Sequence, residues 1–237
     1  MGLYLLLLGV QGAGKGEQAR YVRETYSIPH VSTGDLFRAM QTRDDALARR
    51  VQQILNEGRL VDDDTTNEIV RERLEQPDAQ GGVVLDGYPR SIGQAQWLDA
   101  YLSSRGEKIA SVLLLELDLF TAFQRAFGRV SSVETGQSYN IYSNSDGIEW
   151  AFVESEGCGN HPPRLHATLT ETGEVLKRRP DDANAHAIIK RINAYQQTTM
   201  PLVEYYNDQG ALSRINAAQP IEDVSAQINA VIAQVRV

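Results

Sequence analysis

Cysteine is almost absent from this chain, because Cys158 is the only one among 237 residues. A single cysteine excludes an internal disulfide and is typical of a reducing compartment. No apolar run comes near the roughly 20 residues that a membrane-spanning helix needs. Positive charge is also scarce, and the formal net charge of −8 argues against general binding to nucleic acids or anionic membranes. We therefore expect a cytoplasmic protein with neither kind of partner.

One stretch near the start of the chain carries the strongest functional signal. The apolar run Leu3–Leu8 predicts a buried strand, and the pattern from about Glu17 to Tyr26 predicts a helix. Between them lies Gly9–Gly16, with the sequence GVQGAGKG. A glycine-rich turn between a strand and a helix can point its backbone N–H groups at phosphate, helped by the helix N-terminus. Lys15 adds a full positive charge, so the stretch predicts a site for nucleotide phosphates.

Two residues of this stretch differ from the usual phosphate-loop pattern. The usual lysine is followed by Ser or Thr, whose hydroxyl ligates Mg²⁺, whereas Gly16 has no side chain that could do so. Glu17 comes next and brings a carboxylate close to the expected phosphates. A protein that is acidic overall must therefore concentrate its positive charge locally to bind polyphosphate.

Strand and helix patterns alternate along most of the chain. Further strands are predicted near residues 28–31, 82–86, 112–117 and 212–215, with helical patterns between them, which indicates an α/β fold. One helical pattern continues from Leu36 until Gly58. The triplet Asp62–Asp64 predicts the start of the next helix rather than a metal cluster, since acids in a first turn suit the helix dipole. Pro201 predicts the end or a kink of a later helix.

The segment 130–177 differs from the rest in composition. It is rich in Ser, Asn, Gly, Thr and Glu, and its short alternating stretches predict a small β-rich insert. We expect the aromatic residues Tyr142, Trp150 and Phe152 to form the core of this insert.

Charged residues at the ends of the predicted elements suit phosphoryl transfer. Asp86 ends a predicted strand, where it could orient water around a phosphate-bound Mg²⁺ or simply cap the following helix. Arginine bonds two phosphate oxygens at once, although any single one could be a surface ion-pair partner. The candidate cations are Lys15, Arg38, Arg90, Arg125, Arg129, Arg179 and Arg191. The residues alone thus indicate a nucleotide-dependent phosphoryl-transfer protein and leave its substrate open.

Several motifs together resemble the adenylate kinase family of nucleoside monophosphate kinases. Gly9–Gly16 looks like the family's phosphate loop, in which glycine after the lysine is normal. Asp86–Arg90, with the sequence DGYPR, is similar to its Asp-Gly-aromatic-Pro-Arg signature. Further matches are Ser32–Asp35 with Arg38, Gln94, the Arg125/Arg129 pair, Arg179–Asp182, Arg191 and Thr199–Leu202. The resemblance covers residues 3–124 and 179–237.

This resemblance implies a three-layer P-loop fold with a five-stranded parallel sheet flanked by helices, plus a small β-rich lid. The core would comprise residues 1–129 and 178–237, with an AMP-binding segment at 32–61 and the lid at 130–177. The implied reaction is the reversible transfer of phosphate from Mg·ATP to AMP, giving two ADP. ATP, AMP and ADP would be the partners, Mg²⁺ the cofactor, and the protein a monomer.

The resemblance also implies roles for individual residues. The catalytic residues would be Lys15, Asp86, Arg90, Arg125, Arg129, Arg179 and Arg191. ATP would be bound by Gly12, Ala13, Gly14, Lys15, Gly16, Glu17, Arg125 and Tyr139. AMP would be bound by Thr33, Arg38, Leu60, Val61, Gly87, Arg90, Gln94, Arg179 and Arg191. No side chain would ligate the metal directly, and Asp86 would reach Mg²⁺ through water.

Three positions depart from the family pattern, which usually has proline at Gln11, threonine at Glu17 and often arginine at Val130. Glu17 and the divergent lid keep open the alternative of a nucleotide-binding regulator with weakened catalysis. A kinase for another monophosphate such as UMP, CMP or GMP is a second alternative, because the choice of base depends on a few pocket contacts. Some members hold zinc in the lid with four ligands. Cys158 and His161 resemble half of such a site and His166 lies nearby, but no partner pair occurs between Val130 and Trp150, so we expect no zinc.

Overall fold

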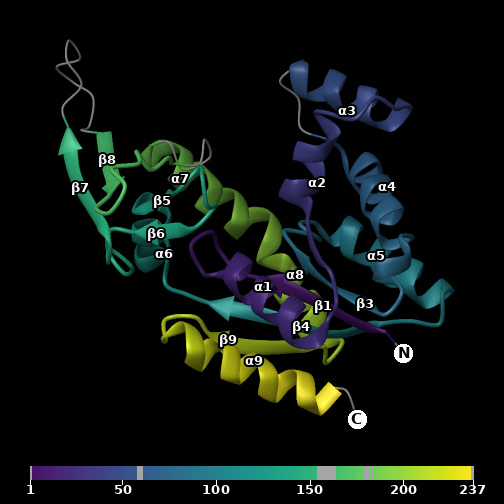
Figure 1. Cartoon of the computed structure of the whole chain (residues 1–237). Coiled ribbons are helices and arrows are strands. Elements are labelled where there is room, and N and C mark those ends of the chain that lie inside the picture. Colours follow the sequence, from purple (N-terminus) through teal and green to yellow (C-terminus); the bar gives the residue numbers. More distant parts are fainter. Residues whose placement is uncertain (1, 58–60, 154–163, 179–181, 183, 236–237) are drawn as a thin grey trace. The chain divides into compact units, whose positions relative to one another are not determined.

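The computed structural model describes residues 2–57, 61–153, 164–178, 182 and 184–235 (Figure 1). The chain divides into two compact units, Met1–Leu117 with Ala194–Val237, and Asp118–Asn193. In the described part of the chain, no helix is long and apolar enough to cross a membrane.

A parallel sheet of five strands forms the centre of the first unit. In chain order its strands are β1 (Leu3–Leu8), β2 (His30–Ser32), β3 (Gly82–Asp86), β4 (Ile109–Glu116) and β9 (Leu212–Asn216). In space their order is β2-β3-β1-β4-β9, which makes β1 the central strand. All four pairings are parallel, so the carboxyl ends of the strands meet at one edge. The predicted α/β fold with a parallel sheet is confirmed.

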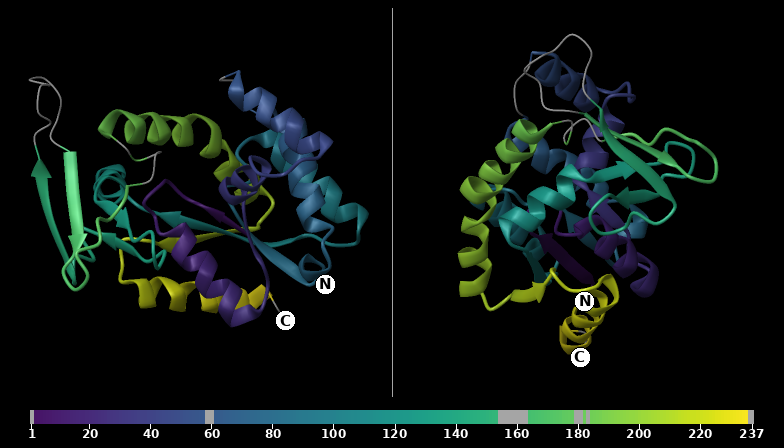
Figure 2. Two further views of the ribbon diagram at one scale, coloured as in Figure 1. Left: turned by 45° about the horizontal axis from the view of Figure 1, so that its top comes forward. Right: turned by 90° about the vertical axis from the view of Figure 1, so that its left-hand side faces the viewer.

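Helices cover both faces of this sheet (Figure 2). On one face α1 (Lys15–Tyr26) packs against α9 (Ile221–Val235), and on the other α5 (Ile92–Ser104) packs against α8 (Pro201–Asp208). Side chains alternate along β1, so Leu6 joins the core beneath α5 and α8 while Leu5 and Leu7 are buried toward the opposite face. Burial on both faces explains why β1 is a continuous apolar run rather than an alternating one.

Three helices follow β2 and form a small core of their own. They are α2 (Thr33–Met40), α3 (Ala46–Asn56) and α4 (Asp63–Leu74), and a short 3₁₀ helix, η1 (Pro77–Ala79), follows them. Met40, Val51 and Ile69 are buried where these three helices meet.

The single helical pattern expected from Leu36 to Gly58 is wrong, because the helix is interrupted between α2 and α3. Asp45 is the N-cap of α3, and its Oδ1 accepts a hydrogen bond from the Ala48 N–H at 3.0 Å. The apolar period continues across the break, but a capping aspartate favours a new helix start. The expectation for the aspartate triplet is confirmed, since Asp62 caps α4 through the Thr65 N–H at 2.8 Å.

The second unit contains α6 (Leu119–Phe127), most of α7 (Ala185–Ala194) and two antiparallel strand pairs. β5 (Arg129–Ser131) pairs with β6 (Ser138–Asn140), and β7 (Ile148–Val153) pairs with β8 (Arg164–Leu169). The prediction of short strands between residues 130 and 177 is thus confirmed.

The expected aromatic core of the insert is wrong. Its hydrophobic core is formed by aliphatic residues: Val130, Ile141, Ile148, Leu165, Ala167 and Leu176. Trp150, Phe152 and Tyr142 are 42%, 43% and 48% exposed. Trp150 and Phe152 lie on β7, which pairs with β8 in a two-stranded sheet, and a two-stranded sheet alone offers little surface to cover large rings. Phe152 instead lies against the ring of Phe127, at a centroid distance of 6.1 Å.

Pro201 acts as expected. The π-helical turn η3 (Tyr195–Thr199) ends just before it, and Pro201 is the first residue of α8. Proline suits this place because the first N–H groups of a helix have no partner within it.

Candidate active site

The Gly9–Gly16 stretch forms a loop between β1 and α1. Its glycines adopt backbone angles that other residues rarely take, with φ of 148° at Gly9 and 87° at Gly14. A Cβ on Gly9 would lie 2.8 Å from the Leu115 carbonyl oxygen, so a larger residue does not fit there. The Lys15 ammonium folds back over the loop and donates to the carbonyl oxygens of Gly9 at 2.6 Å and Val10 at 3.1 Å. The result is a glycine-rich turn that opens directly into a helix N-terminus: Gly12 and Ala13 lie in the turn, Gly14 is the N-cap of α1, and Gly16 is in its first turn.

Asp86 lies beside this loop at the carboxyl end of β3. In the sheet it is paired with Leu7 of β1, two residues before Gly9. Burial raises the pKa of the Asp86 carboxyl, but the nearby His30 imidazole and the positive charges of Lys15 and Arg90 outweigh burial, so the pKa lies below its ordinary value. His30 Nε2 is 3.6 Å from Oδ2, which is an ion-pair distance rather than a hydrogen bond. Asp86 is therefore an ionised carboxylate at the strand end and does not cap α5, whose N-cap is Ser91.

The turn after Asp86 gathers several of the expected AMP-site residues. The Gly87 carbonyl oxygen accepts from Thr33 Oγ1 at 2.9 Å and from Arg90 Nε at 2.8 Å. Gly87 has a φ of 76°, and a Cβ there would lie 2.9 Å from Thr33 Oγ1. Thr33, Gly87 and Arg90 therefore form one cluster that has no room for a larger residue at its centre.

Gln94 belongs to the same cluster. Its side chain is buried, and its Oε1 accepts from the Arg90 backbone N–H at 2.8 Å. Its Nε2 donates to Asp63 Oδ1 at 2.6 Å. Sequence analysis named Gln94 but missed Asp63, which was interpreted only as part of a helix start.

Two further residues expected at the AMP site, Arg38 and Val61, lie among the helices that follow β2. Arg38 is exposed on α2 and pairs with Asp35 one turn earlier. Val61 packs against the small core of α2, α3 and α4. Leu60 lies outside the described residues.

Glu17, the most unusual residue of the loop, forms an ion pair with Arg20 of the same helix. The two side chains are 44% and 59% exposed. Arg20 thus supplies a counter-charge to Glu17, as the i,i+3 spacing on a helix allows.

The second unit holds a separate cluster of cations around Asp182. The Asp182 side chain is fully buried and pairs with both Arg129 and Arg191. Arg191 Nη1 donates to Oδ1 at 2.7 Å, while Arg129 donates to Oδ2. Sequence analysis named both arginines as site residues and missed the aspartate that holds them together.

The second unit also contains the remaining residues that the sequence suggested for the nucleotide site or a zinc site. Arg125 is in the last turn of α6, and its carbonyl oxygen accepts from Asn140 Nδ2 at 2.7 Å. Tyr139 is half-buried on β6 and packs against the aliphatic core. Arg179 lies outside the described residues, as do Cys158 and His161 of the expected half zinc site. His166 is described and is exposed on β8.

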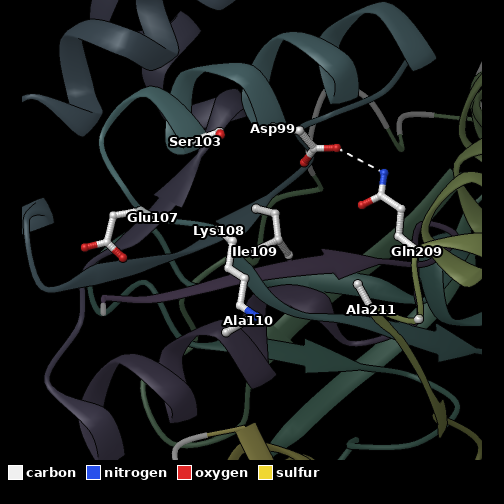
Figure 3. Close-up of a pocket in the computed structure, with 9 residues that line it drawn as sticks. Asp99, Ser103, Glu107, Lys108, Ile109, Ala110, Gln209 and Ala211 are labelled. Carbon is white, nitrogen blue, oxygen red and sulfur yellow. Dashed lines mark hydrogen bonds between the residues drawn. The ribbon is translucent and has the colours of Figure 1, made fainter.

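A cavity in the first unit lies elsewhere (Figure 3). Asp99, Glu107 and Gln209 are among its lining residues, and Asp99 Oδ2 accepts from Gln209 Nε2 at 3.2 Å. Ile109, which begins β4, also lines it. The cavity is therefore at the amino end of β4, opposite the strand ends that carry Gly9 and Asp86, and it is not part of the candidate site.

The first unit combines parallel strands, a glycine-rich loop with a lysine, and a carboxylate at the end of the neighbouring strand. A nucleotide phosphate site requires these features. The fold and the site thus define a P-loop nucleotide-binding protein of the phosphoryl-transfer class. The family model described as adenylate kinase matches residues 7–211. The chain belongs to the adenylate kinase family.

Individual relatives match along nearly the whole chain. The adenylate kinase of Moorella thermoacetica is 38% identical over 220 residues, which cover 93% of each protein. The adenylate kinase of Listeria monocytogenes serotype 4b is 35% identical over 229 residues, covering 97% of this chain and 98% of the relative. That of Thermoanaerobacter pseudethanolicus is 34% identical over 224 residues, covering 94% and 95%.

Proposed function

We propose that this protein is an ATP:AMP phosphotransferase that converts Mg·ATP and AMP reversibly into two ADP. The observation that carries the proposal is the hydrogen-bonded cluster of Thr33, Gly87, Arg90 and Gln94, in which Gly87 directly follows Asp86. A protein that only bound or hydrolysed a nucleotide would need the phosphate loop but no second polar cluster. A second cluster beside the loop suits a phosphoryl acceptor that carries its own phosphate and base.

On the donor side, the loop residues 12–17 would bind the ATP phosphates through backbone N–H groups, and Lys15 would carry the charge of the outer phosphates. Magnesium fits this place because Asp86 is an ionised oxygen donor beside the loop. Asp86 would hold the ion through water, and the bound ion would add positive charge at the phosphate oxygens.

On the acceptor side, Arg38 and Arg90 would bind the AMP phosphate. Arg90 presents its guanidinium from the turn that Gly87 closes. Thr33, Leu60, Val61, Gly87 and Gln94 would surround the nucleoside. The buried Gln94 amide is the polar group best suited to read the base.

Arginines of the second unit would also serve the transfer. Arg125, Arg129, Arg179 and Arg191 would neutralise the transferring phosphoryl group, since such transfer depends mainly on alignment and positive charge. Arg179 and Arg191 would also contact AMP, while Arg125 and Tyr139 would lie at the ATP base. Residues 130–177 would act as a lid that excludes water, so that AMP and not water accepts the phosphate.

One assay tests the proposal. Purified protein is mixed with Mg·ATP and with AMP, UMP, CMP or GMP in turn, and ADP formation is followed. ADP formation with AMP supports the proposal. Turnover with UMP, CMP or GMP alone would assign the protein to another monophosphate. ATP binding without any turnover would favour a nucleotide-binding regulator. The carboxylate of Glu17 in the phosphate loop is the observation that suggests this alternative.

A further inference from the structure

The second aspartate of the Asp62–Asp64 triplet contacts a different helix. Asp62 caps α4, with Oδ1 accepting from the Thr65 N–H at 2.8 Å. Asp63 instead turns toward the first turn of α5. Its Oδ2 accepts from Ser91 Oγ at 2.6 Å, and its Oδ1 accepts from Gln94 Nε2 at 2.6 Å. One carboxylate thus uses both oxygens on side chains three residues apart.

The first turn of α5 accommodates this carboxylate. Ser91 Oγ donates a hydrogen bond to Asp63 and accepts one from the Gln94 N–H at 3.2 Å, so the hydroxyl is used both as a donor and as an acceptor. Gly93 lies next to it, and a Cβ there would be 3.4 Å from Asp63 Oδ2, an ordinary van der Waals contact.

The two partners of Gln94 determine which way its amide faces. A carboxylate only accepts hydrogen bonds, so the amide nitrogen must face Asp63. A backbone N–H only donates, so the amide oxygen must face Arg90. The amide cannot turn over without breaking both bonds and placing like groups against each other. One hydrogen on Nε2 and one lone pair on Oε1 remain for a ligand.

This fixed orientation has a consequence for the base of a nucleotide. Adenine offers an N6 amino donor, whereas guanine and hypoxanthine have an O6 acceptor there, and the neighbouring N1 reverses in the same way. A glutamine that is free to turn could match either edge, but one held in place matches only one of them. We propose that Asp63 is a positioning residue that fixes the Gln94 amide and thereby selects a 6-aminopurine monophosphate over a 6-oxopurine one. The inference rests on the proposed function, which places the AMP base at Gln94.

The test compares the KM for AMP with the inhibition constant of inosine monophosphate, which differs from AMP at this edge. In Asp63→Ala the preference for AMP over inosine monophosphate should fall about 10-fold, through a higher KM for AMP with a nearly unchanged kcat. Asp63→Asn keeps one carbonyl oxygen for Gln94 and should retain most of the preference. Asp64→Ala removes an exposed carboxylate from the same helical turn and should change neither constant.

A purely structural role for Asp63 would give a different result. If Asp63 only connected α4 to α5, Asp63→Ala would weaken the binding of both nucleotides equally. An unchanged preference for AMP over inosine monophosphate would therefore overturn the inference. Should Asp63→Ala not fold, Asp63→Ser, whose hydroxyl cannot reach both partners, is measured in its place with the same expected fall. The wild-type protein is assayed first. If it does not phosphorylate AMP, the proposed function itself is refuted, and this outcome is distinct from any effect of the variants.

Discussion

Arg129 donates two hydrogen bonds, from Nε and Nη2, to a single carboxylate oxygen of Asp182. The second oxygen of Asp182 accepts from Arg191, so one fully buried carboxylate holds two guanidinium groups. Their like charges would repel each other without it. This arrangement positions two of the cations that the proposed reaction requires before any substrate binds.

Replacing Asp182 with alanine should therefore weaken both stability and catalysis. We expect the free energy of unfolding to fall by about 2–3 kcal/mol, less than for a fully buried pair because both arginines keep some contact with solvent. The kcat should fall about 100-fold, since displaced cations no longer meet the transferring phosphoryl group. Denaturant titration and the ADP assay measure the two effects.

Glu116 provides a matched control, because its pair with Arg214 lies on the surface with side chains about half exposed. Glu116→Ala should lower the free energy of unfolding by less than about 1 kcal/mol. Equal losses in the two variants would show that the Asp182 pairs contribute no more than an ordinary surface pair.

Lys15 is the cation of the phosphate loop, and its removal should abolish turnover without unfolding the protein. In Lys15→Met we expect kcat/KM to fall by about 1,000-fold, because the outer phosphates lose their full positive charge. Arg23→Met, on the same helix but with an exposed ion pair to Glu24, should behave like wild type. A near-normal rate in Lys15→Met would show that Gly9–Gly16 does not bind the transferred phosphate.

The negative charge of Glu17 should weaken ATP binding, and the ion pair with Arg20 should reduce this effect. We expect Glu17→Thr to lower the KM for ATP about 3-fold, because a negative charge next to the phosphates is removed. Arg20→Ala should raise the KM, since the Glu17 carboxylate loses its counter-charge. In the double variant Arg20→Ala should have no further effect, and a double-mutant cycle on the KM for ATP measures this coupling. Independent effects of the two substitutions would argue that the ion pair has no influence on the loop.

The ionised state of Asp86 predicts a pH dependence of stability. Its pKa in the folded protein lies below its ordinary value of about 3.9. A lowered folded-state pKa means that the ionised carboxylate stabilises the fold above about pH 4, and that this contribution is lost as the pH falls through the folded-state pKa. The difference in unfolding free energy between wild type and Asp86→Asn should therefore shrink as the pH falls from about 5 toward 3. Urea titrations at several pH values measure it, and a difference that stays constant would contradict the prediction.

The sheet and the phosphate loop could be predicted because their signals are local. Leu3–Leu8 and Gly82–Asp86 are short apolar runs, and both occur as strands at the predicted residues. The break between α2 and α3 was missed because the apolar period continues through it, while the signal for it was a single capping aspartate, Asp45.

The roles of Asp63 and Asp182 could not be predicted for a different reason. Asp63 bonds residues 28 and 31 positions away, and Asp182 bonds one 53 positions away. In the sequence each looks like a helix-start aspartate, which is the most common use of such a residue. Only the fold decides whether a carboxylate near a helix start caps that helix or binds a side chain from elsewhere.

The sequence by itself determined which residues form strands, where the phosphate loop lies and which cations are available, because apolar periodicity and glycine patterns act over a few residues. The tertiary structure decided which of these elements are neighbours. Leu7 pairs with Asp86 because β3 returns to lie beside β1, after a stretch of chain that contains α1, β2, α2, α3 and α4. That pairing depends on how the connecting helices pack on the sheet, and it brings the Lys15 loop and the Asp86 carboxylate into one site.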